Sequence, residues 1–128
     1  MGHRLNGNGR TSIDVVRCPG NLNAARMVKI KTRFGRLINR NRRFFLLDLK
    51  EAHHADLAGL GILVDRLRKI RSLKGDIRLF NLRPEVFEIL QIIGLNQIIE
   101  AYPTEEEARR SFSATKIGGP ATNFGGQV

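Results

Sequence analysis

The stretch that decides the fold is FFLLDLKEAHHADLAGLGILVDRLRKI, residues 44–70. Its first part, FFLLDL at 44–49, is a short continuous apolar run, which is typical of a strand covered on both faces. Its last part repeats leucine, valine and isoleucine at helical spacing, at positions 60, 63, 64, 67 and 70. A buried strand followed at once by an amphipathic helix indicates a β-α unit.

The same alternation of strand and helix extends in both directions along the chain. The expected strands are 12–18, 44–49, 76–82 and 97–102, each followed by an expected helix. Asn21 or Asn23 can cap the first helix, and Gly94 should end the third. Thr104 should begin the last helix, with Glu107 completing a capping box.

Strands joined by helices of this length are usually parallel, with right-handed crossovers. The pattern therefore predicts an α/β fold, with a sheet of four or five strands covered by about four helices. The sheet should be mostly parallel, and mixed if an N-terminal edge strand pairs antiparallel. We expect one domain over residues 12–112, between disordered tails at 1–11 and 113–128 that are rich in glycine.

The composition is that of one domain in a reducing compartment. The chain has 128 residues and 41% hydrophobic content, which is enough for a single core. It contains no run of about 18 apolar residues, and its N-terminus lacks the charged-then-apolar pattern of a signal peptide. Its one cysteine, Cys18, cannot form an internal disulfide. We therefore expect a cytoplasmic protein.

Positive charge is concentrated in one part of the chain. The net charge is +10, and no Asp or Glu lies between Val15 and Leu47. We name eight basic residues of that window the basic patch: Arg26, Lys29, Lys31, Arg33, Arg36, Arg40, Arg42 and Arg43. An acidic protein surface, anionic lipid or nucleic acid could each bind such a face.

The polar residues before the second helix have three interpretations. His53, His54 and Asp56 offer metal ligands, but no second cluster completes a coordination shell, so we expect no metal. Gly59 and Gly61 lack the spacing and the lysine of a phosphate-binding loop, so we expect no nucleotide or other cofactor. The third interpretation is a helix start displayed to a partner, with Asp56 as its N-cap. Close packing of the two glycines against the sheet explains the same spacing equally well.

At this point the chain resembles a known family. Residues 44–70 resemble the signature of STAS domains, typified by bacterial anti-sigma-factor antagonists. That signature is an apolar strand ending in Asp-Leu, a short loop, then Asp-Ser-Ser/Thr-Gly-Leu-Gly at a helix start. The resemblance extends over VVRCPGNLNAA (15–25) and GDIRLFNLRPEVFEILQIIGLNQIIEAYPTEEEA (75–108). It implies a STAS-like fold and a non-enzymatic role in protein recognition within a bacterial partner-switching pathway.

This chain departs from the signature at the position that regulates the family. In the family, the hydroxyl residue just before the first glycine is phosphorylated by a partner kinase that is also an anti-sigma factor. The added charge breaks the complex. Asp56 and the Gly-Leu-Gly at 59–61 match the signature, but Leu57 and Ala58 occupy the two hydroxyl positions. Ala58 stands where the phosphoacceptor would be, so the resemblance implies a module that phosphorylation there cannot switch off.

The resemblance also implies a contact surface and a partner. The expected partner-binding residues are Asn21, Asn23, Asp56, Leu57, Ala58, Gly59 and Leu60. The implied partner is an anti-sigma factor that is a serine kinase of the GHKL type, or a related switch protein, and a homodimer is a further alternative. Leu57 is either an exposed anchor for the partner or part of the core.

Other functions are less well supported. A STAS accessory of a lipid or anion transporter could hold the basic patch against an anionic membrane. Nucleic-acid binding is disfavoured because no stacking aromatics are interleaved with the charge. An enzyme is not expected, since neither Asp48 nor Cys18 has a nucleophile or base beside it. We expect Asp48 to hold loop backbone by hydrogen bonds and Cys18 to be half-buried.

Overall fold

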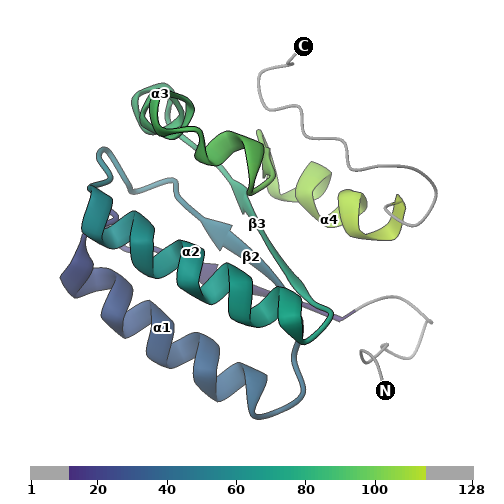
Figure 1. Cartoon of the computed structure of the whole chain (residues 1–128). Helices are drawn as coiled ribbons and strands as arrows, with labels where there is room; N and C mark the ends of the chain where they lie inside the picture. The colour runs from purple at the N-terminus through teal and green to yellow at the C-terminus, as the bar shows by residue number, and fades with distance from the viewer. Residues whose placement is uncertain (1–11, 115–128) are drawn as a thin grey trace.

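The computed structural model describes residues 12–114, so the tail expected at 1–11 and nearly all of the tail expected from 113 lie outside the described residues. The chain alternates strands and helices as predicted (Figure 1). In order, the elements are β1 (Ile13–Arg17), α1 (Ala24–Ile38), β2 (Phe44–Asp48), α2 (Leu57–Ser72), β3 (Asp76–Phe80), α3 (Pro84–Ile93), the 3-10 helix η1 (Leu95–Gln97), β4 (Ala101–Tyr102) and α4 (Glu105–Ala114).

The four strands form one sheet in the order β1-β2-β3-β4, and every pair is parallel. Leu46 in β2 aligns with Val15 in β1 and with Arg78 in β3. The predicted α/β class is confirmed. The antiparallel edge strand that would make the sheet mixed does not occur within residues 12–114, and the chain before them is not described.

Helices cover both faces of the sheet. Figure 1 shows α1 and α2 side by side on one face and α4 on the other. Side chains alternate along β2, so Phe45 and Leu47 enter the core under α1 and α2, whereas Leu46 packs under α4. Phe45 meets Phe34 of α1 edge to face, with ring centroids 5.1 Å apart. No helix in the described chain is both long and apolar enough to span a bilayer.

The prediction of a strand over residues 97–102 is wrong for its first four residues. Gly94 ends α3 as expected, in a left-handed conformation with φ 82°. The chain then turns through η1, where the Ile98 amide donates to the Leu95 carbonyl at 2.9 Å. Only Ala101 and Tyr102 pair with β3. A short apolar run does not distinguish a helical turn from a strand, and here the residues that follow Gly94 form a 3-10 turn.

A buried polar network attaches α4 to the sheet. Arg78 is 4% exposed, and its Nε lies 3.2 Å from Glu100 Oε1. Its Nη1 donates to Ser111 Oγ at 2.6 Å, and its guanidinium lies 4.1 Å from the centre of the Phe112 ring. The Tyr102 hydroxyl donates to Glu100 Oε1 at 2.8 Å. α4 is therefore held by a hydrogen bond and a cation–π contact from Arg78 as well as by apolar packing, and Glu100 balances the charge of Arg78.

Candidate functional site

The first turn of α2 projects from the loop that follows β2. Asp56 caps it as predicted, because its Oδ1 accepts a hydrogen bond from the Gly59 amide at 2.7 Å. The side chains of Asp56, Leu57 and Ala58 are exposed, and we call these three residues the tip. Gly59 and Leu60 are buried beneath them. Leu57 is 71% exposed, so it lies outside the core.

The two glycines of α2 have opposite surroundings. A Cβ atom at Gly59 would collide with the backbone carbonyl of Leu22, and would lie 2.9 Å from the carbonyl carbon of Asn23. A Cβ atom at Gly61 would meet nothing within 4 Å. Close packing therefore explains Gly59, whereas Gly61 faces open space at the surface.

The loop between β1 and α1 is joined to the loop before the tip. The Asn21 side-chain oxygen accepts from the amides of His53 and His54, at 2.8 and 3.1 Å. The Leu22 amide donates to the His54 carbonyl at 3.0 Å. The other predicted asparagine, Asn23, caps α1 by accepting from the Arg26 amide at 2.8 Å. Both asparagines thus lie beside the tip, and their side-chain oxygens hold backbone in place.

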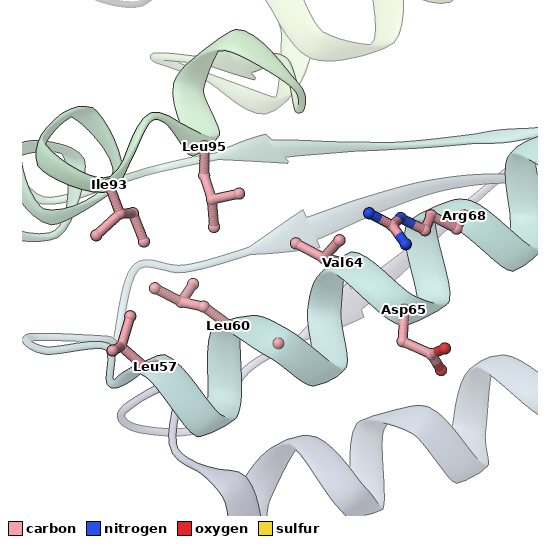
Figure 2. Close-up of a pocket in the computed structure, with 8 residues that line it drawn as sticks. Leu57, Leu60, Val64, Asp65, Arg68, Ile93 and Leu95 are labelled. Atoms are coloured by element: carbon pink, nitrogen blue, oxygen red, sulfur yellow. The ribbon is translucent and has the colours of Figure 1, made fainter.

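An apolar groove of about 420 Å³ runs from the tip along the side of α2 that faces α3 and η1. Figure 2 shows Leu57, Leu60 and Val64 of α2 turned toward Ile93 and Leu95, which come from α3 and η1. The full lining is Leu57, Leu60, Gly61, Val64, Asp65, Arg68, Ile93 and Leu95, which we call the α2–α3 groove.

The α2–α3 groove was not predictable from local sequence patterns. Its two walls are about 30 residues apart in the chain, and only the fold brings them together. One usable signal exists: Ile92 and Ile93 are adjacent isoleucines, and only one of two neighbouring helix positions can face the core. Ile92 is 75% exposed and Ile93 39% exposed.

The end of the groove away from the tip is positively charged. Asp65 is engaged by Arg66 at 3.0 Å and by Lys31 of α1 at 3.9 Å. Arg68 is exposed and makes no ion pair with any residue between 12 and 114. A ligand with an apolar body and an acidic end therefore matches the groove.

The residues named as the basic patch do not form one surface. Arg42 is paired with Asp14 of β1 at 2.6 Å, and Arg43 donates to the backbone carbonyls of Ile38 and Arg42. Lys31 lies on the side of α1 that faces α2, within reach of Asp65. Arg26, Lys29, Arg33 and Arg36 follow a separate line along α1, and Arg40 lies in the turn after it.

The Asp48 carboxylate and the Cys18 thiol, the two groups considered for catalysis, both have structural roles in the fold. Asp48 Oδ1 accepts from the Lys50 amide at 3.0 Å and from Asn81 Nδ2 at 3.1 Å, as expected for a loop-holding carboxylate. Cys18 is fully buried and not half-buried as expected, and burial raises the pKa of its thiol to about 11. Such a thiol is a poor nucleophile near neutral pH. Within the described residues, no three potential ligands are grouped around a metal position.

The chain matches one known protein family and several of its members. A family model described as STAS domain matches residues 5–108. The chain is 34% identical over 61 residues to an anti-sigma-B factor antagonist of Listeria monocytogenes, which is 48% of this chain and 54% of the relative. The match therefore spans about half the length of that relative. This chain is also 25% identical over 93 residues to BtrV of Bordetella bronchiseptica, which carries the name of an anti-sigma factor antagonist. That match covers 73% of this chain and 80% of BtrV.

Solved structures share the fold. The unphosphorylated form of the anti-sigma factor antagonist SpoIIAA superposes with a TM-score of 0.63 at 25% identity, over 77% of this chain and 86% of that one. The STAS domain of a SulP transporter from Vibrio cholerae superposes with a TM-score of 0.66 over 88% of this chain and 92% of that one. At 19% identity, the second likeness concerns the fold alone.

Proposed function

This chain belongs to the STAS domain family, and we propose that it is a non-enzymatic interaction module that acts like an anti-sigma-factor antagonist. Its proposed partner is an anti-sigma factor of the GHKL serine-kinase type or a related switch protein. The observation that carries the proposal is Leu57, an apolar side chain 71% exposed at a capped helix start, in a chain similar to anti-sigma-factor antagonists.

Docking takes place at the tip and continues into the α2–α3 groove. Burying Leu57 in a partner pocket would contribute about 1.5–3 kcal/mol through removal of apolar surface from water. The tip is already ordered by its cap and by the joined loops, so little conformational entropy is lost on binding. Arg68 would meet an acidic group of the partner at the other end of the groove.

The proposed module lacks the phosphorylation switch. Ala58 occupies the position of the family's phosphoacceptor and is exposed, so a hydroxyl there would be open to a kinase. Alanine has no oxygen to accept a phosphoryl group. The complex is therefore expected to persist when the partner kinase is supplied with ATP.

The test is to mix the purified chain with each anti-sigma kinase encoded in the same genome and to measure complex formation with and without ATP. The wild-type chain should bind one of them under both conditions. A58S should bind without ATP, then become phosphorylated and be released with ATP. A58E should bind weakly, whereas the control S72E, which adds the same charge near the other end of α2, should bind normally. Absence of a complex with every such kinase contradicts the proposal.

A further inference from the structure

Four basic residues lie in a line along one flank of α1, and a fifth, Arg40, lies in the turn just after the helix. Positions 26, 29, 33, 36 and 40 alternate steps of three and four, which keeps the helical members within an arc of about 80°. At 1.5 Å per residue the four helical members span about 15 Å. We call it the basic stripe: Arg26, Lys29, Arg33, Arg36 and Arg40.

The basic stripe faces away from the rest of the molecule. Lys31, which pairs with Asp65, marks the flank of α1 that faces α2. The stripe lies on the opposite flank, and α1 is the outermost of the helices on its face of the sheet (Figure 1). It is therefore separate from the α2–α3 groove, and a ligand could occupy one while a partner occupies the other.

Three cations of the stripe are not neutralised within the described chain. α1 contains no acidic residue. Lys29, Arg33 and Arg36 are exposed and make no ion pair or side-chain hydrogen bond with any residue from 12 to 114. Only Arg36 lies in the last turn, where a cation complements the helix dipole. Folding therefore does not account for Lys29 and Arg33.

The stripe contains a hollow suited to a phosphate group. Arg33, Arg36, Leu37 and Arg40 line a depression of about 260 Å³. One guanidinium group can donate hydrogen bonds to two phosphate oxygens at once, which makes arginine well suited to phosphate recognition. The fourth wall is the half-buried, apolar Leu37. The hollow thus offers cations to a phosphate and an apolar surface to whatever carries it.

We propose that the basic stripe docks this protein on an anionic phospholipid bilayer, with the hollow around Arg33, Arg36 and Arg40 taking a headgroup phosphate. A lipid phosphate is joined to glycerol and acyl chains, whose apolar surface can pack against Leu37. The sugar and base of a nucleotide offer less apolar surface for that contact. Single-stranded nucleic acid needs exposed aromatic side chains for stacking, and residues 12–114 expose none.

The test is sedimentation of the full chain with vesicles of phosphatidylcholine, with and without phosphatidylglycerol. The wild-type chain should sediment only with the anionic vesicles, and added salt should release it. R33Q/R36Q should bind about 30-fold more weakly, since each cation near the surface contributes about one factor of five. The control R109Q/R110Q removes the same charge from α4 on the opposite face of the sheet, and should bind as wild type does.

Competition identifies the anion. Duplex DNA and poly-glutamate, added at equal charge, should displace the chain from anionic vesicles poorly. Tighter binding to either polymer than to the vesicles overturns the lipid assignment. Equal sedimentation with and without phosphatidylglycerol overturns it as well. An equal loss in the two double variants would mean that net charge, and not the stripe, drives binding. The kinase-binding assay above is independent of all these outcomes, so the two proposals can fail separately.

Discussion

The backbone carbonyl of Leu22 accepts a hydrogen bond from the Asp56 amide at 3.0 Å, and thereby ties the start of α1 to the start of α2. The same carbonyl occupies the space that a side chain at position 59 would need. The orientation of the tip thus depends on a contact between two loops that are more than 30 residues apart in the chain.

The two glycines of α2 should respond oppositely to alanine. G59A places a methyl group against the Leu22 carbonyl and should lower the free energy of unfolding by about 1–3 kcal/mol. G61A meets no neighbour, and should raise it by up to about 1 kcal/mol because alanine favours the helix. Urea denaturation of both variants checks this. Equal destabilisation by the two changes would show that the backbone contact is unimportant.

Removal of the cap should loosen the tip. D56A loses the hydrogen bond to the Gly59 amide and should lower the free energy of unfolding by about 0.5–2 kcal/mol. D56S keeps a capping oxygen and should retain most of the stability. Hydrogen exchange of the first-turn amides of α2 should accelerate in D56A and not in D56S. If both variants exchange alike, another group caps the helix.

Leu57 should affect binding far more than folding. L57A should weaken partner binding by about 2 kcal/mol, or roughly 30-fold, if the side chain is the docking anchor. Its unfolding free energy should change by less than about 0.5 kcal/mol, because the side chain is mostly in solvent. V28A is the matched control, since Val28 is also exposed, at 54%, but lies on α1. Calorimetric titration and denaturation separate the two effects, and an L57A variant with unchanged affinity would remove Leu57 from the interface.

The buried pair under α4 should be needed for stability. R78A leaves Glu100, which is 8% exposed, without its ionic partner, and should cost about 3–5 kcal/mol. R110A breaks an exposed pair with Glu106 and should cost under about 1 kcal/mol. Thermal unfolding of the two variants measures the contrast. A small effect of R78A would mean that Glu100 reaches solvent or becomes protonated at little cost.

Stability should decline in alkaline solution. Burial raises the pKa of Cys18 from 9.0 to about 11 and that of Tyr102 from 10.0 to about 12. Between pH 9 and about 11 the unfolded chain loses the Cys18 proton while the folded chain keeps it, so the free energy of unfolding falls as pH rises. Denaturation midpoints across this range test the slope.

C18A is the control for the alkaline prediction. It should flatten the slope between pH 9 and 10 and leave the part due to Tyr102 between pH 10 and about 12. The Cys18 thiol of the native wild-type chain should react slowly with iodoacetamide at pH 8 and quickly once urea unfolds it. Fast labelling of the native thiol would contradict its burial.

Local sequence predicts most of the elements and several of their ends. The alternation of apolar patterns predicted the α/β order, and Asp56 and Gly94 were identified as helix ends because capping depends on residues a few positions apart. The strand predicted at 97–102 is wrong because local sequence does not show where its apolar run divides between a 3-10 turn and a two-residue strand.

By itself, the sequence determined the class of fold, the capped start of α2 and the absence of a hydroxyl at position 58. The tertiary structure alone decided that Leu57 points outward, that Ile93 and Leu95 complete a groove beside it, and that four of the eight patch cations share a flank of α1 that no acidic residue covers within the described chain. Helix periodicity and capping arise from interactions between near neighbours in the chain. Exposure and grooves arise from which distant segments pack together, and that depends on the whole core at once.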